Sequence, residues 1–231
     1  RGLLIGGDRL AQPPPADLPF TVVNNYGPTE ATVVATAGVV DPAEATIHIG
    51  RPIANASIYL LDRHGEPVPM GVAGEMYVGG AGVARGYLNR AELTAERFLP
   101  DPFAQHADAR MYRTGDLARW RNDGTIEFLG RNDDQVKLRG FRIELGEIEA
   151  QLRKQPGVRE AVVLLREDGG AQRLVAYEVG EAAAPALRQV LGLVSPAYMA
   201  PAAYVVLQAS PLPANGKPHR QASSRAYSDS L

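Results

Sequence analysis

The chain of 231 residues contains no cysteine. A disulfide, a thiol nucleophile and a thiolate metal site are therefore all excluded. The four histidines, His48, His64, His106 and His219, are scattered and lack the spacing of zinc ligands. We interpret them as loop residues and expect no histidine metal centre.

The chain also lacks a basic excess and a long apolar run. Its formal net charge is -2, whereas a nucleic-acid surface needs clustered positive charge. No apolar run approaches the roughly 20 residues that span a bilayer. We expect neither a nucleic-acid nor a membrane partner. The opening RGLLIGGDRL has no initiator Met and no signal-peptide architecture, and it begins on an apparent strand, so we expect a piece of a longer protein.

What is present is 45% hydrophobic residues, enough for one large domain or two small ones. Up to about residue 130, β-branched and alternating runs predict short strands. ASIYLLD and GEMYVGG should form one hairpin, and the runs flanking Asn122-Asp123-Gly124 should form another. AELTAERFL (91–99) should be a short helix with Leu93 and Phe98 facing inward, and Ala95 as a further candidate.

The pattern then changes to a compact α+β unit. ELGEIEAQLRKQPG predicts a helix with Leu145, Ile148 and Leu152 on one face. VREAVVLLRE and RLVAYEV read as paired strands, and AAYVVLQ as a last strand. The boundary between the two parts should lie near 131–134.

Asn24-Asn25-Tyr26-Gly27-Pro28-Thr29-Glu30 is the first segment that could carry chemistry. Its Gly-Pro turn presents a ring, a hydroxyl and a carboxylate together. The ring could stack on a base, the hydroxyl could bond a phosphate, and the carboxylate could hold Mg²⁺. A capped turn with an exposed glutamate explains the segment equally well.

Three further segments are ambiguous by themselves. Asp116 of YRTGDLA could accept bonds from a ribose diol, or could simply cap a turn. The charged run 130–149 could be a hinge, or a solvated linker. GGAGVARGY (79–87) matches no phosphate-loop pattern, and we interpret it as a structural turn. Lys217 of PLPANGKPHR could belong to a tail or stand at a loop tip.

In this order, NNYGPTE, GEMYVGGAGVARGYLN, YRTGDLARW, GRNDDQVKLRGFRIELGEIE and LPANGKPHR resemble the adenylation domains of nonribosomal peptide synthetases (NRPS). These domains belong to the adenylate-forming ligase superfamily. The resemblance runs nearly end to end and implies the C-terminal half of such a domain. It implies an α/β to α+β fold. Residues 1–132 would end the large β-rich core, and residues 133–231 would form the small mobile lid domain.

The resemblance implies a cytoplasmic enzyme that uses ATP and Mg²⁺ in antibiotic or siderophore biosynthesis. An amino-acid carboxylate would attack the α-phosphate of ATP, giving an aminoacyl-adenylate and pyrophosphate. The phosphopantetheine thiol of a carrier domain would then take the aminoacyl group as a thioester. The N-terminal half, with the family's phosphate loop, would be a necessary partner.

The family's roles transfer to matching positions of this chain. Catalysis would use Lys217, Thr29 and Glu30, with Glu30 as the Mg²⁺ ligand. Nucleotide binding would involve Gly7, Asp8, Asn24, Tyr26, Gly27, Thr29, Asp116, Phe128, Arg131 and Lys217. In this scheme Tyr26 stacks on adenine, and Asp116 binds the ribose hydroxyls with help from Arg131.

Two further sets of residues follow from the resemblance. The substrate pocket would be lined by Leu4, Gly6, Asn25, Val33 and Val34. Asp133 would be the hinge, and Lys137, Arg139 and Gly140 would belong to the loop that enters the site for thioester formation. A small MbtH-like helper protein would dock between AELTAERFL and MYRTGD, with Ala109 as a candidate contact, although an ordinary surface loop explains this segment too.

The chain departs from the family pattern at two places. Phe128 stands where a tyrosine is usual, which should weaken nucleotide binding by about one hydrogen bond, ~1 kcal/mol. Pro218 and His219 stand where the family favours an apolar residue and Asp. Two other functions remain open. One is an acyl- or aryl-acid ligase of the same superfamily, and the other is a non-catalytic half that docks carrier or MbtH-like partners.

Overall fold

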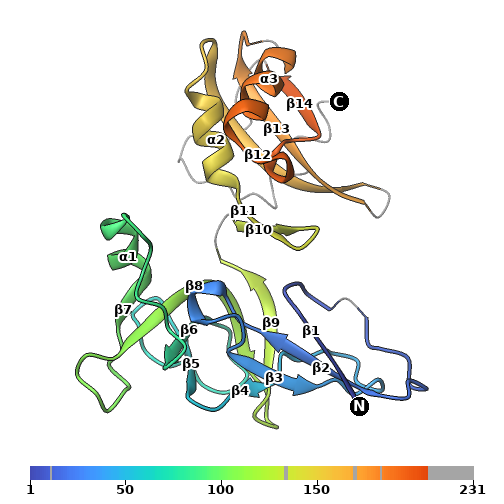
Figure 1. Cartoon of the computed structure of the whole chain (residues 1–231), viewed down its shortest axis with the longest axis vertical. Helices are drawn as coiled ribbons and strands as arrows, with labels where there is room; N and C mark the ends of the chain where they lie inside the picture. The colour runs from blue at the N-terminus through green and yellow to red at the C-terminus, as the bar shows by residue number, and fades with distance from the viewer. Residues whose placement is uncertain (11, 133–134, 169–170, 183, 208–231) are drawn as a thin grey trace. The chain divides into compact units, whose positions relative to one another are not determined.

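The computed structural model describes residues 1–231 except 11, 133–134, 169–170, 183 and 208–231. The chain divides into two compact units, Arg1–Asp133 and Asp134–Leu231. Each unit has its own buried apolar cluster and is described by itself (Figure 1). Both are rich in sheet, and together they give the α/β to α+β class that the sequence predicts.

The first unit begins with a four-stranded sheet in the order β1-β2-β3-β4. Its strands are β1 (Gly2–Gly6), β2 (Thr21–Tyr26), β3 (Thr36–Val39) and β4 (Arg51–Pro52). β1 and β2 are parallel, and the other pairs are antiparallel. The 3₁₀ helix η1 (Thr29–Ala31) lies between β2 and β3. This sheet therefore contributes two adjacent carboxyl ends, those of β1 and β2.

A second sheet of the same unit has the order β5-β6-β8-β7, with β9 also paired to β8. Its strands are β5 (Ala56–Leu61), β6 (Gly74–Gly80), β7 (Phe98–Pro100), β8 (Arg110–Trp120) and β9 (Ile126–Arg131). The β5–β6 and β8–β9 pairs confirm both predicted hairpins. The alternating residues Met76, Val78 and Ala118 are buried together with Tyr26 and Ile49. One apolar cluster thus joins residues from both sheets.

The short helix α1 (Ala91–Arg97) forms where the sequence predicts one, but its inward face was predicted wrongly. None of its residues is buried, and Leu93 and Ala95 are exposed. Phe98 is buried, yet it belongs to strand β7 rather than to the helix. A helix of seven residues has only two turns, so the change to strand at residue 98 redirects the apolar side chain into the sheet.

The second unit packs helices on a three-stranded sheet, β12-β13-β14. Its elements are β10 (Gln135–Leu138), β11 (Phe141–Glu144), α2 (Leu145–Arg153), β12 (Val158–Asp168), β13 (Ala171–Gly180), α3 (Ala184–Val194), the 3₁₀ helix η2 (Ala197–Met199) and β14 (Ala203–Leu207). The predicted helix face is confirmed, because Leu145, Ile148 and Leu152 are all buried. They pack with alternate sheet residues such as Val163 and Leu174, so α2 covers one face of the sheet.

Among the described residues, no helix is both long enough and apolar enough to cross a membrane.

Candidate functional site

The carboxyl ends of the parallel strands β1 and β2 lie side by side. Gly6 pairs in register with Asn25, and a Cβ at Gly6 would stand 2.7 Å from the carbonyl oxygen of Asn25. Gly6 therefore allows the two strands to approach closely. Gly7 and Asp8 follow at the exposed end of β1. In open sheets with parallel strands, ligands bind in the crevice outside such carboxyl ends.

Asp116 is the centre of a buried polar cluster at this end of the unit. Its carboxylate accepts a hydrogen bond from the hydroxyl of Tyr26 on Oδ2. Its Oδ1 atom accepts from Arg131 Nη1 at 2.6 Å, an ion pair whose side chains are 7% and 13% exposed. Arg131 also donates from Nη2 to the carbonyl oxygen of Thr114 at 3.0 Å. The structure thus brings together three residues that the sequence predicts at the ribose and base.

Strand pairing explains how these residues meet. Asp116 on β8 is in register with Arg131 on β9, so their side chains share one face of the hairpin. The hydroxyl of Thr114 accepts from the backbone N–H of Asp116 at 3.0 Å and donates to the carbonyl oxygen of Met76 at 2.7 Å. Thr114 is a supporting residue that sequence reasoning missed, although it lies within the YRTGD segment.

Tyr26 remains a hydrogen-bond donor to Asp116. Burial raises the pKa of its phenol well above the usual value, and the charge of Asp116 raises it further. The ring of Phe128 lies 6.1 Å from the Tyr26 ring at a tilt of 37°. A ring at position 128 therefore lines the cluster, but it contributes no hydroxyl.

Asn24 and Asn25 alternate across β2 and have different surroundings. Asn24 is buried, and its Nδ2 donates to the carbonyl oxygen of His48 at 2.9 Å. Asn25 is half-buried beside Gly6. The structure therefore gives Asn24 an anchoring contact inside the unit, and it puts Asn25 at the end of the parallel pair.

The turn after β2 depends on Gly27. A Cβ there would lie 2.6 Å from both the backbone N of Ala35 and the carbonyl oxygen of Val33. Thr32 and Val33 follow η1 with positive φ values of 59° and 72°, which β-branched residues rarely adopt. Backbone strain of this kind clusters at functional sites. Val33 and Leu4, two of the predicted pocket residues, are largely exposed in the described structure, and Val34 is half-buried.

Glu30 is held by two tyrosines from the second sheet and its loop. Its Oε1 atom accepts from the hydroxyl of Tyr87 at 2.6 Å and from that of Tyr112 at 2.8 Å. The two hydroxyl oxygens lie 3.2 Å apart. Thr29, the preceding residue, is exposed. Sequence reasoning missed both tyrosines, although they lie in the ARGY and MYRTGD segments that it had singled out.

Mg²⁺ is the metal that the resemblance implies. The described residues contain no group of three or more His, Cys, Asp or Glu side chains that could hold a metal ion. Mg²⁺ bound with a nucleotide usually takes one or two carboxylates plus phosphate oxygens, so a lone Glu30 beside the Thr29 hydroxyl fits this ion.

Several predicted residues belong to the second unit or lie outside the described residues. Lys137 is on β10, and Arg139-Gly140 form the turn to β11 with positive φ values of 53° and 80°. Asp133 and Lys217 lie outside the described residues. In the first unit, the backbone of Ala109 donates to His106 and accepts from Asp101, so this residue is anchored in its loop.

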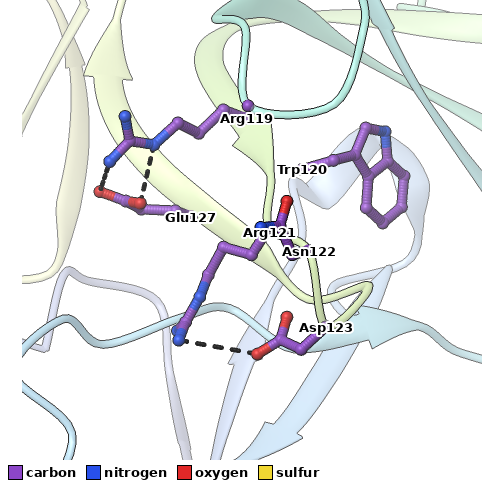
Figure 2. Close-up of a pocket in the computed structure, with 7 residues that line it drawn as sticks. Arg119, Trp120, Arg121, Asn122, Asp123 and Glu127 are labelled. Carbon is purple, nitrogen blue, oxygen red and sulfur yellow. Dashed lines mark hydrogen bonds and ion pairs between the residues drawn. The ribbon is translucent and has the colours of Figure 1, made fainter.

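A separate shallow pocket of about 420 Å³ lies at the tip of the β8–β9 hairpin (Figure 2). Its charged side chains pair with one another: Arg119 Nε donates to Glu127 at 2.9 Å, and Arg121 contacts Asp123 at 3.6 Å. Four residues of strand separate Asp116 from Trp120 in this pocket, roughly 13 Å. The pocket is therefore distinct from the Asp116 cluster.

Comparison with known proteins agrees with this geometry. The family model described as AMP-binding enzyme matches residues 1–88. The chain is 55% identical to a linear gramicidin synthase of Brevibacillus parabrevis over 231 residues, covering 96% of this chain and 4% of that protein. It is 53% identical to malpibaldin synthetase of Mortierella alpina, covering 91% of this chain and 4% of that protein.

Solved structures agree as well. One is holo-PA1221, an NRPS protein containing adenylation and PCP domains, with a TM-score of 0.79, 37% identity, and coverage of 98% of this chain and 40% of that one. Another is IdnL1, with a TM-score of 0.78, 32% identity, and coverage of 91% and 45%. The chain thus spans about 4% of the length of the curated relatives and less than half of these structures.

These observations define an AMP-binding, adenylate-forming enzyme fold, and the chain belongs to that family. Within the family it is part of an adenylation domain of the NRPS type.

Proposed function

We propose that this chain supplies the ribose-, phosphate- and Mg²⁺-binding part of a domain that activates an amino acid with ATP. An oxygen of the amino-acid carboxylate would bond to the α-phosphorus, and the bond from that phosphorus to the bridging oxygen would break. The products are aminoacyl-AMP and pyrophosphate. The observation that carries this proposal is the buried Asp116, held by Tyr26 and Arg131 near the carboxyl ends of β1 and β2.

In this proposal Asp116 accepts hydrogen bonds from the ribose hydroxyls. Two contacts already orient its carboxylate, so little further ordering is needed when the nucleotide binds. Arg131 offsets the negative charge of Asp116 and lies beside the ribose. Tyr26 and Phe128 supply aromatic surface for the adenine, and Gly7 and Asp8 form the edge of the base pocket.

The phosphates would lie over η1. Thr29 would donate its hydroxyl to a phosphate oxygen, and Glu30 would hold Mg²⁺, which when bound neutralises charge on the phosphates. Lys217 would donate to the developing negative charge of the α-phosphate. A lysine suits this step because its ammonium is a compact, flexible point charge.

The amino-acid side chain would contact Leu4, Gly6, Asn25, Val33 and Val34. The rest of the pocket would come from a further part of the domain. β1 supports this, because it is an apolar strand at the sheet edge with four of its five residues exposed. Parallel strands are normally covered on both faces, so another segment should cover β1.

A carrier domain would complete the reaction. Its phosphopantetheine sulfur would attack the aminoacyl carbonyl carbon, forming a thioester and releasing AMP. Lys137, Arg139 and Gly140 would approach the site in this step, with a hinge at Asp133. An MbtH-like partner would contact the loop that contains Ala109.

The test is ATP–pyrophosphate exchange by the complete domain with a panel of amino acids. Asp116→Asn should raise KM for ATP roughly tenfold or more, because a hydrogen bond to a charged group contributes about 1.5–3 kcal/mol. Lys217→Ala should lower the maximal exchange rate. The matched control is Asp123→Asn, the same change at the exposed tip of the β8–β9 hairpin; it should leave exchange unchanged.

Unaltered exchange in both Asp116→Asn and Lys217→Ala would overturn the assignment. Exchange that responds to aryl or fatty acids and not to amino acids would instead identify an acyl- or aryl-acid ligase. No exchange with any carboxylic acid would favour a docking role.

A further inference from the structure

The Glu30 carboxylate is linked to two other segments of the first unit. Tyr87 follows β6 in the loop, and Tyr112 lies on β8, which also carries Asp116. Both hydroxyls donate to the same oxygen atom, Oε1. Two donors on one oxygen restrict rotation of the carboxylate about its terminal bond, and so fix the direction in which it can meet a ligand.

The two tyrosines are themselves rigidly held. Tyr112 is 1% exposed, and its ring packs on Phe98 with centroids 5.1 Å apart. The Tyr87 ring meets the same Phe98 edge-on, at 5.3 Å and 74°. The backbone N–H of Tyr87 donates to Thr94 Oγ1 at 2.9 Å. These contacts position both hydroxyls before any ligand arrives.

The backbone around Glu30 is tied to the same loop. Ala84 N–H donates to the carbonyl oxygen of Glu30 at 2.8 Å, and Thr32 Oγ1 donates to the carbonyl oxygen of Gly82 at 2.6 Å. Arg110 Nη2 in turn donates to the carbonyl oxygen of Ala84 at 2.9 Å. The loop 81–87 therefore supports both the backbone and the carboxylate of Glu30.

Tyr87 keeps its proton over the whole physiological range. Burial raises the pKa of its phenol, and the hydrogen bond to Glu30 raises it further. The hydroxyl is therefore available as a donor whenever Glu30 is ionised.

We propose that Tyr87 and Tyr112 are positioning residues that orient the Glu30 carboxylate for a divalent cation and thereby set the affinity of the domain for that cation. This inference rests on the proposed function, in which Glu30 is the Mg²⁺ ligand. Residues that hydrogen-bond a metal-binding carboxylate commonly change metal affinity or activity 10- to 100-fold when they are replaced. The GGAGVARGY loop, read from sequence as a structural turn, would then also contribute to cation binding through Tyr87.

The experiment measures cation dependence in the complete domain. ATP–pyrophosphate exchange is titrated with Mg²⁺ at saturating ATP and amino acid. Mn²⁺ binding in the presence of a non-hydrolysable ATP analogue is followed by electron paramagnetic resonance. Tyr87→Phe and Tyr112→Phe should each raise the Mg²⁺ concentration for half-maximal exchange, and the Mn²⁺ Kd, roughly tenfold or more. At saturating Mg²⁺ the KM for the amino acid should be unchanged.

The matched control is Tyr59→Phe, which removes a hydroxyl that donates to Asp101 at 3.2 Å in the same sheet. It should leave both cation readouts at wild-type values. Glu30→Gln should weaken Mn²⁺ binding more than either tyrosine variant does. If Tyr112→Phe does not fold, the half-buried Tyr87 still decides, because Tyr87→Phe keeps the ring that packs on Phe98.

The outcomes separate the two levels of the argument. Wild-type Mn²⁺ affinity in Glu30→Gln would remove the metal role of Glu30, and the proposed function would fail at that residue. Loss of affinity in Glu30→Gln together with wild-type cation dependence in both tyrosine variants would overturn the positioning role alone.

Discussion

Two buried glutamates of the second unit show how much the surroundings of one residue type can differ. Glu149 is 5% exposed, and its carboxylate accepts from the backbone N–H of Val163 at 2.9 Å and from Arg153 at 3.0 Å. Glu178 on β13 is 2% exposed, and neither of its carboxylate oxygens has a hydrogen-bond partner among the described residues. Burial consequently raises the pKa of Glu178.

This pKa shift predicts a pH dependence of stability. The folded state favours protonated Glu178, so its contribution is fully present below the unfolded pKa of about 4.3 and is lost as pH rises through the higher folded value. Glu178→Gln should therefore unfold at a higher temperature than wild type at pH 8, and the difference should shrink toward pH 4. Thermal unfolding across this range measures it. Glu149→Gln is the control and should destabilise at pH 8, since it loses a charge-assisted bond. A constant difference between Glu178→Gln and wild type at all pH values would contradict the prediction.

At the scale of elements, the predictions succeeded where a pattern repeats within the element. The β8–β9 hairpin follows from alternation on both sides of Asn122-Asp123-Gly124, where Gly124 has a φ of 79° and Thr125 N–H donates to Asp123 Oδ1. Helix α2 follows from its 3.6-residue apolar period. Helix α1 is too short for such a period to identify its buried side, so its inward face was predicted wrongly.

Glycine substitutions in two elements should have opposite effects. Gly27→Ala should destabilise the first unit by about 1–3 kcal/mol, because the new Cβ collides with rigid backbone atoms of residues 33 and 35. Gly192→Ala in α3 meets no atom within 4 Å and should stabilise the second unit by about 0.5–1 kcal/mol. Urea unfolding followed separately in each unit measures both. A neutral Gly27→Ala would show that this turn adjusts without cost.

At the scale of the whole molecule, the two units have separate cores. Tyr26, Met76 and Ile126 belong to a cluster of the first unit, whereas Ile148, Leu152 and Val163 belong to a cluster of the second. A unit with its own core can unfold independently of its neighbour.

A core substitution in the second unit tests this independence. Leu152 is fully buried, so Leu152→Ala should cost the second unit about 2–5 kcal/mol. Amide hydrogen exchange should accelerate in 135–207 while the strands of the first unit keep their protection. Equal acceleration in β6 and β8 would instead show that the two units unfold as one.

The sequence by itself determined the class of fold, the hairpins, the helix α2 and the identity of the residues that resemble a nucleotide site. Those features depend on patterns among residues close in the chain, which can be read without a structure. Tertiary structure decided which side chains meet. Tyr26 reaches Asp116 across 90 positions of sequence, and Tyr112 reaches Glu30 across 82.

Such contacts depend on strand register and on the packing of two sheets around one core, and a slip of one residue would turn each side chain to the opposite face. For that physical reason the sequence could nominate Glu30 as a ligand, but only the fold could bring Tyr87 and Tyr112 to it.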